Sequence, residues 1–226
     1  AQSFSRGAAV SDVSVGAADD ERWRVRSGTA VTFVPDTEIF GDYMGEHARE
    51  GGRAARPIDY DTILARIREI AFLNRGIRFH VRGPADAGFG LVAYEGGLRE
   101  YVEYMTQDKT RVHEVISFGG SGGDLDIECA MVWCSESYSS TVVGYANSVR
   151  TVDGGTHVEG LKRGLSKVVN ALAAKYRSKF AELRPDDTIS GEHIREGLVC
   201  VLSVKLRGPE FEGQTKTKLG NQFVRK

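Results

Sequence analysis

The residues best suited to chemistry in this sequence lie in the segment QTKTK at residues 214–218. An apolar run at residues 198–206 precedes this segment and predicts a buried strand. Glycine and proline residues between the two require a turn, so the segment should lie on a loop beyond the strand. On such a loop, Lys216 could bring an ammonium group and Gln214 an amide donor to a phosphate. The alternative is a solvated basic loop before a surface helix, and we expect Lys218 to be a solvent-facing charge on that helix.

Other residue types do not suggest a second site of catalysis. The segment GGSGG at residues 119–123 lacks the Lys-Ser/Thr pair of a phosphate-binding loop, and we expect it to be a flexible connection between neighbouring strands. His157 falls in the first turn of a predicted helix, where structural capping is the simpler interpretation. We expect no metal site in this chain, because no spacing among its five histidines matches a motif such as HExxH; they are His47, His80, His113, His157 and His193.

The elements that must position these residues follow from their apolar patterns. Apolar residues recur every three or four positions between residues 156 and 180, which predicts an amphipathic helix. Thr156 and Glu159 match a capping box at its start. Shorter helices are predicted at 61–74, 98–105 and 190–196, and strands at 112–118, 125–133 and 138–145.

The charge pattern suggests one basic surface on a chain that is otherwise nearly neutral. The formal net charge is −1, so the whole chain gives no indication of a nucleic-acid partner. Residues 161–180, however, contain six Lys or Arg and no acidic residue. Lys162, Arg163 and Lys167 should face outward from the predicted helix, where they could contact phosphate groups or simply be solvated.

Cysteine content and hydropathy limit the class of protein further. The three cysteines are odd in number, lack CxxC spacing and lie in apolar runs, so we expect buried free thiols; they are Cys129, Cys134 and Cys200. No run approaches the roughly 18 apolar residues of a membrane span, and we expect no membrane partner. The chain begins without Met, and we expect it to be a fragment.

Several separate motifs occur in an order that resembles a known family. The most specific are DGGTH at 153–157, REGL at 195–198 and FEGQTK at 211–216; further matches lie at 28–36, 39–40, 70–76 and 94–97. Together they closely resemble the B subunits of bacterial-type DNA gyrase, with the B subunits of topoisomerase IV as the second choice. The resemblance extends through nearly the whole chain.

This resemblance implies an α+β fold in two parts. Residues 1–84 would form the C-terminal part of an ATPase domain of the GHKL type, which is an α/β sandwich. Residues 88–226 would form a transducer domain that resembles domain 2 of ribosomal protein S5. Residues 42–57 contain few large apolar groups, and we expect them to be a mobile insertion.

The resemblance also implies the roles of individual residues. Lys216 would contact the γ-phosphate of ATP, and Gln214 would donate to the same phosphate. Thr29 would line the adenine end of the pocket, where Gly28 lets the backbone approach a ligand. The cofactor would be ATP with Mg²⁺, but the family's glutamate base and magnesium ligand precede this segment. We therefore expect the chain alone to be inactive.

The implied function is that of an ATP-dependent type II DNA topoisomerase. ATP hydrolysis would be coupled to closure of the B-subunit clamp, DNA strand passage and negative supercoiling. The implied partners are the gyrase A subunit, a second B subunit and double-stranded DNA, in the bacterial cytoplasm or in a chloroplast or mitochondrion. The alternative is a non-enzymatic, S5-like nucleic-acid-binding module that uses the basic helix. That alternative leaves the QTKTK segment unexplained.

Overall fold

The computed structural model divides the chain into two compact units, Ala1–Asp59 and Tyr60–Lys226. The first unit contains a small antiparallel pair of strands, β1 (Phe4–Ser5) and β2 (Ala8–Ala9). The structure describes residues 2–5, 7–14, 28–31, 60–83, 89–135, 137–179 and 188–225. The predicted insertion at 42–57 lies outside these ranges.

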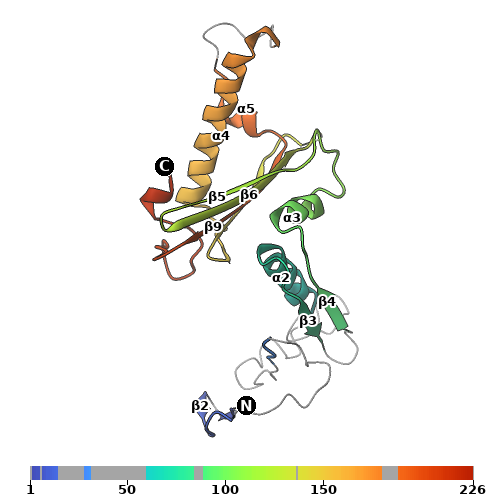
Figure 1. Cartoon of the computed structure of the whole chain (residues 1–226), viewed down its shortest axis with the longest axis vertical. Helices are drawn as coiled ribbons and strands as arrows, with labels where there is room; N and C mark the ends of the chain where they lie inside the picture. Colours follow the sequence, from blue (N-terminus) through green and yellow to red (C-terminus); the bar gives the residue numbers. More distant parts are fainter. Residues whose placement is uncertain are drawn as a thin grey trace, which may run out of the picture. The chain divides into compact units, whose positions relative to one another are not determined.

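A five-stranded sheet forms the centre of the second unit (Figure 1). In spatial order its strands are β5 (Ile116–Gly122), β6 (Leu125–Trp133), β9 (Leu198–Leu206), β7 (Thr141–Ala146) and β8 (Val149–Arg150). All neighbours are antiparallel except β9 and β7, which are parallel. Strand β9 is the predicted buried strand, and its central place in the sheet explains why its residues are almost continuously apolar.

Helices cover both faces of this sheet. On one face, α3 (Leu98–Met105) and the end of α2 (Tyr60–Leu73) contact a cluster that includes Val199 and Val201. On the other face, α4 (Thr156–Lys175) contacts Cys200 and Leu202, and α5 (Gly191–Arg195) lies close to α4. The alternation of β9 residues between the two clusters follows from the two-residue period of a strand.

Helix α4 differs from its prediction at the start and along its outer half. The predicted capping box is wrong, because Gly155 is the N-cap and no side chain caps the helix. The amide of Thr156 donates instead to the carbonyl of Leu219, at 3.0 Å. Farther along, the apolar stripe is exposed at Val168 and Leu172, because the helix extends beyond the sheet (Figure 1).

The remaining predictions met mixed outcomes. The short helix capped by Ser190 is confirmed, since the Ser190 hydroxyl accepts a hydrogen bond from the amide of His193. The prediction of a flexible connection at residues 119–123 is wrong, because β5 continues through Gly122 and pairs with β6 across a tight turn. The three cysteines are free and buried, as predicted. The fold class, α+β, is also confirmed.

The predicted domain boundary near residues 84–88 stays a prediction. Strands β3 (Phe79–Arg82) and β4 (Phe89–Val92) form an antiparallel pair on either side of it, and residues 84–88 are outside the described ranges. In the part of the chain that the structure describes, no helix combines the length and the apolar character that crossing a membrane requires.

Candidate functional site

The QTKTK segment lies on a loop after β9, and we call residues 207–221 the lysine loop. The loop folds back on itself through an antiparallel bridge between Phe211 and Leu219. Leu219 also forms a parallel bridge with Gly155, immediately before α4. Because Leu219 is fully buried, it fixes the base of the loop against the start of α4.

A buried asparagine closes the lysine loop. The Asn221 side chain accepts a hydrogen bond from the amide of Glu210 at 2.8 Å and donates one to the carbonyl of Gly208 at 3.2 Å. Asn221 itself is only 4% exposed, and both bonds are partly buried. An amide side chain can donate and accept at once, which allows one residue to join both sides of the loop.

Lys216 lies in a turn at the exposed tip of this loop. Its backbone has a φ of +56°, a left-handed conformation that is uncommon for a residue with a side chain. Among the described residues, no hydrogen-bond or ion-pair partner contacts the Lys216 ammonium or the Gln214 amide, and both residues are exposed. Both groups are therefore available to a ligand.

Lys218 has a different environment from Lys216. Its ammonium forms an ion pair with Glu212 at 3.0 Å, and the residue lies in the loop. The expectation that Lys218 would be a charge on a helix face is wrong, because the following helix, η4 (Gln222–Arg225), begins only at Gln222. The structure thus distinguishes one available lysine from one paired lysine within the same segment.

The first turn of α4 contains a buried histidine. His157 Nε2 lies 3.0 Å from the hydroxyl of Thr151, which also donates to the carbonyl of Gly144. Burial lowers the pKa of His157 to about 4, so the ring is neutral at pH 7. The expectation of a capping role is wrong, because the His157 ring bonds instead to Thr151, which in turn bonds to β7.

The structure separates the three basic residues proposed for DNA contact. Arg163 and Lys167 are exposed and line a shallow pocket of about 520 Å³ between α4 and η4 (Gln222–Arg225). Arg225, which sequence reasoning missed, lines the same pocket and is paired with Glu159 at 2.9 Å. Lys162 is partly buried and does not line it.

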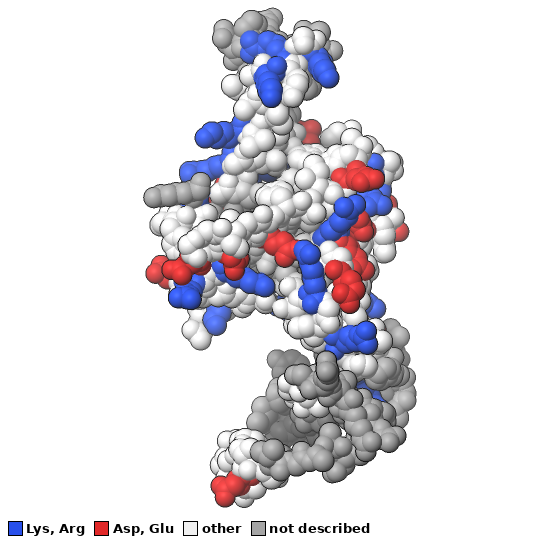
Figure 2. Space-filling model, in the orientation of Figure 1, with Lys and Arg blue, Asp and Glu red and all other residues white. Residues whose placement is uncertain are grey.

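The outer end of α4 is also basic. Figure 2 shows lysine and arginine side chains gathered there, where the exposed residues include Lys175, Arg177 and Lys179. The ammonium groups of Lys175 and Lys179 lie 5.4 and 5.9 Å from the centre of the Tyr176 ring. These are cation–π distances.

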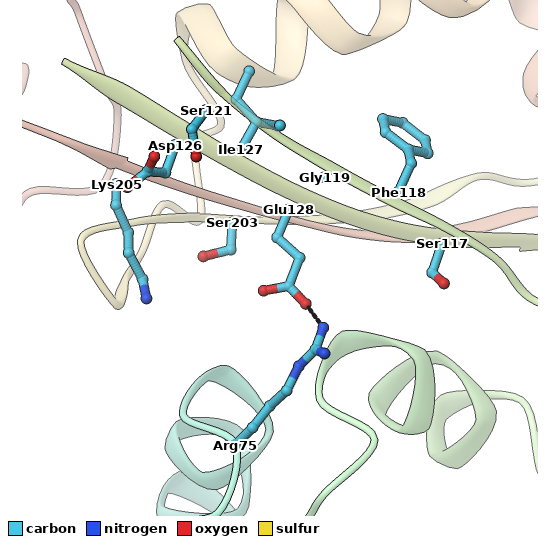
Figure 3. A pocket seen from close by; sticks show the side chains of 11 residues that line it. Arg75, Ser117, Phe118, Gly119, Ser121, Asp126, Ile127, Glu128, Ser203 and Lys205 are labelled. Carbon is cyan, nitrogen blue, oxygen red and sulfur yellow. Dashed lines mark hydrogen bonds and ion pairs between the residues drawn. The ribbon is translucent and has the colours of Figure 1, made fainter. Parts of the chain in front are cut away.

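A second pocket, which sequence reasoning also missed, lies on the opposite face of the sheet. It has a volume of about 400 Å³ and is crossed by an ion pair between Arg75, after α2, and Glu128 on β6 (Figure 3). Asp126 and Lys205 line it as well. Its acidic and basic groups balance, so charge alone would select neither an anion nor a cation. In the sequence, the only indication of this pocket was the alternation of the acidic residues Asp126 and Glu128 along β6.

The residues predicted for the adenine end lie in the first unit. Gly28 and Thr29 are exposed and have irregular backbone, and their role stays a prediction. Within the described ranges, no cluster of three or more His, Cys, Asp or Glu side chains is placed to hold a metal ion.

Comparison with known proteins identifies the family. The DNA gyrase B family model matches residues 97–226. The B subunit of DNA gyrase from Synechocystis sp. is 47% identical over 202 residues, which cover 88% of this chain and 17% of that protein. The mitochondrial B subunit of DNA gyrase from Arabidopsis thaliana is 41% identical over 229 residues, covering all of this chain and 29% of that protein. This chain thus spans less than a third of either relative.

Solved structures agree with this assignment. The 43K ATPase domain of Thermus thermophilus gyrase B, in complex with an aminocoumarin, superimposes with a TM-score of 0.65 at 26% identity. The match covers 84% of this chain and 47% of that one. The topoisomerase IV ATP-binding domain of Francisella tularensis gives a TM-score of 0.58 at 25% identity, over 74% of this chain and 45% of that one. Because the family model matches more than half of the chain, and relatives above 40% identity cover nearly all of it, this chain belongs to the DNA gyrase B family.

Proposed function

We propose that this chain is part of the B subunit of an ATP-dependent type II DNA topoisomerase, and that Lys216 senses the γ-phosphate of ATP. The chain comprises the end of the ATPase domain, residues 1–84, and the transducer domain, residues 88–226. Membership of the gyrase B family and the likeness to ATPase-domain structures support this assignment. Relatives from bacteria and plant organelles support a location in the bacterial cytoplasm, a chloroplast or a mitochondrion.

The observation that carries the proposal is the environment of Lys216. Its ammonium has no partner among the described residues, yet its backbone is held in a left-handed turn on a loop with a buried base. Such strain, of order 1–3 kcal/mol, persists only where the surroundings impose it and is common at ligand sites. A lysine presented in this way can neutralise charge on a terminal phosphate, while the Gln214 amide donates to the same group.

The chain's own residues account for the phosphate contact but not for the whole reaction. ATP with Mg²⁺ would supply the phosphoryl group and the metal charge, and the magnesium ligands lie outside this chain. Lys216 stabilises the negative charge that spreads over the γ-phosphate oxygens in the transition state. When the phosphate leaves, this charge-assisted bond is lost and the lysine loop is released.

The conformational change on release of the lysine loop would be transmitted to the rest of the protein through the base of the loop. Because Leu219 is bonded to the start of α4, a change in the loop biases the position of that helix. This coupling drives closure of the clamp between two B subunits and, with the A subunit, strand passage and negative supercoiling. Arg163 and Lys167, together with Lys162, are the proposed contacts to double-stranded DNA.

The proposal is tested by Lys216→Ala in the full-length protein, assembled with its A subunit. ATP hydrolysis should fall by about 100-fold or more, as expected when one charged group leaves a transition-state site, and supercoiling should be lost. DNA binding should stay nearly unchanged, because Lys216 does not contact DNA in this proposal. Lys218→Ala is the matched control, since its ammonium is already paired with Glu212. Normal ATP turnover by the Lys216 variant would disprove the phosphate-sensor role.

A further inference from the structure

The backbone beside Lys216 pairs with the segment that begins α4. Leu219 lies between this segment and the other side of the lysine loop, so it acts as a short central strand. The pairing consists of three hydrogen bonds, from Asp153 N to Thr217 O (2.9 Å), from Leu219 N to Gly154 O (3.2 Å) and from Thr156 N to Leu219 O (3.0 Å). Thr217 directly follows Lys216, so this pairing fixes the chain one residue away from the proposed phosphate contact.

Gly155 makes this pairing possible because it has no side chain. A Cβ atom there would lie 2.4 Å from the Leu219 oxygen and 2.5 Å from its nitrogen, which is far inside van der Waals contact. Both clashing atoms are backbone, so no rotation of a side chain could relieve the overlap. Gly155 also has a φ of +129°, a conformation that L-residues with side chains rarely adopt.

The neighbouring glycine provides a natural contrast. Gly154 also has a positive φ, +74°, but the nearest atom to a Cβ placed there is 3.8 Å away, on Val158. Alanine at position 154 would therefore add backbone strain without displacing the lysine loop. Alanine at position 155 would add strain of the same kind and would also push Leu219 away.

The centre of the pairing, at Leu219, is buried in the core, whereas Asp153 at its outer end is exposed. Leu219 is fully buried in a cluster that includes Val158 of α4 and Val224 of η4. Thr156 and His157 are also buried, at 6% and 2% exposure. A buried backbone group that loses its hydrogen-bond partner is costly. A displacement of the lysine loop should therefore carry the start of α4 with it.

We propose that Gly155 is a positioning residue for ATP hydrolysis. It allows Leu219 to pair with the start of α4, and this pairing sets the location of the Lys216 ammonium relative to the γ-phosphate. The inference rests on the proposed role of Lys216. Within the DGGTH segment, at residues 153–157, it assigns to the missing side chain of Gly155 the task of holding the lysine loop in register.

The test compares Gly155→Ala with Gly154→Ala in the full-length protein, assembled with its A subunit. For Gly155→Ala, kcat for ATP hydrolysis should fall by about 10- to 100-fold, the loss expected when a catalytic group is misplaced by about 1 Å. The KM for ATP should change by less than about threefold, because a contact made mainly in the transition state affects kcat. Gly154→Ala should keep kcat within about threefold of wild type. Equal kcat for Gly155→Ala and wild type would overturn the inference.

A double variant separates positioning from a general loss of structure. If Gly155 acts through Lys216, the Gly155→Ala/Lys216→Ala protein should be no slower than Lys216→Ala alone, within about twofold. Multiplied losses in the double variant would overturn the inference. A loss in Lys216→Ala with normal turnover in Gly155→Ala would reject the positioning role while preserving the phosphate sensor. Normal turnover in Lys216→Ala would reject the sensor itself.

A measurement on the wild-type protein covers the case in which Gly155→Ala does not fold. The amides of Leu219 and Thr156 should show slow hydrogen exchange, because both donate within the buried pairing. A non-hydrolysable ATP analogue should slow the exchange of both amides further, by at least about threefold. Rapid exchange of either amide, or exchange unaffected by the analogue, would contradict the proposed coupling.

Discussion

At the scale of single residues, His157 shows how the start of α4 is held. The Thr151 hydroxyl lies 3.0 Å from the Gly144 carbonyl and 3.0 Å from His157 Nε2. When the hydroxyl donates its one hydrogen to Gly144, it accepts the second bond from His157, and the neutral ring then carries its proton on Nε2. Gly144 makes room for it, since a Cβ there would lie 2.6 Å from Nε2.

The buried imidazole predicts a specific dependence of stability on pH. Burial lowers the pKa of His157 to about 4, whereas an unfolded histidine has a pKa of about 6.5. Between these values the unfolded state binds more protons, so the free energy of unfolding should decrease as the pH falls. The loss from this residue should reach about 2 kcal/mol at pH 5. Urea unfolding of wild type and of His157→Gln at pH 7, 6 and 5 measures it.

The glutamine variant is the control for other titrating groups. Its amide can still donate to Thr151 but does not titrate in this range, so its unfolding free energy should vary less with pH than that of wild type. Equal pH slopes for the two proteins would show that His157 does not carry the effect.

At the scale of elements, α2 is held by aromatic contacts to Tyr94 and to α3, and by polar contacts to the sheet of the second unit. The Phe72 ring stacks on Tyr94 and Tyr101, with centroids 3.7 and 4.6 Å away. Glu69 accepts a hydrogen bond from the Tyr145 hydroxyl at 3.3 Å and pairs with Arg150 at 3.0 Å. Helix α2, which sequence reasoning assigns to the ATPase domain, thus packs directly against the predicted transducer sheet.

The polar part of this contact predicts a measurable loss of stability. Tyr145 is fully buried, and its hydroxyl also lies 3.1 Å from that of Tyr101. Tyr145→Phe would leave the Tyr101 hydroxyl without this partner and remove the hydrogen bond to Glu69, so the free energy of unfolding should fall by about 1–3 kcal/mol. Tyr104→Phe, at a partly exposed ring, should change it by less than about 0.5 kcal/mol. Denaturant unfolding of both variants measures the difference. Equal stabilities would show that the hydrogen bonds among Tyr101, Tyr145 and Glu69 do not stabilise the packing of α2.

The elements that sequence reasoning located correctly are those with strong local periodicity. Strands β6 and β9 and helix α2 match their predictions closely, because their apolar residues follow a strand or helix period. The errors arose where a distant residue decided the structure. The Leu219 carbonyl takes the amide of Thr156 that a capping box would use, and pairing with β6 orders a glycine-rich strand of low intrinsic propensity.

The candidate site was predictable in the same partial way. The glycines and the proline after a buried strand predicted that Lys216 lies on a loop. The family resemblance then implied the γ-phosphate of ATP as its ligand. The partners that distinguish Lys216 from Lys218 could not be read from sequence, since they depend on how the loop folds. Arg225 and the Arg75–Glu128 pair were missed because tertiary contacts alone bring them to their pockets.

At the scale of the whole molecule, the proposal that this chain is part of an ATP-hydrolysing subunit predicts how the chain behaves alone. Incubated with ATP and Mg²⁺, the isolated chain should show no turnover above background, because the base and metal ligands expected for the family precede this segment. Measured turnover would show that the chemistry has been mislocated.

The same preparation separates the two classes of function. Gyrase membership predicts that the chain alone binds duplex DNA weakly. A titration over a series of salt concentrations measures the affinity and its slope. Tight binding that falls steeply with salt would favour the S5-like nucleic-acid-binding module, with Lys162, Arg163 and Lys167 on the phosphate backbone.

Because α4 is long, a small rotation at its base displaces its opposite end by a much larger distance. The helix has 20 residues, or about 30 Å at 1.5 Å per residue, and its outer half extends past the sheet. A tilt of about 5° at the end bonded to Leu219 would therefore sweep the opposite end through about 2.6 Å, by simple lever geometry. Under the proposed function, loss of the γ-phosphate at the lysine loop would therefore produce a larger displacement at the basic end of α4, around Tyr176.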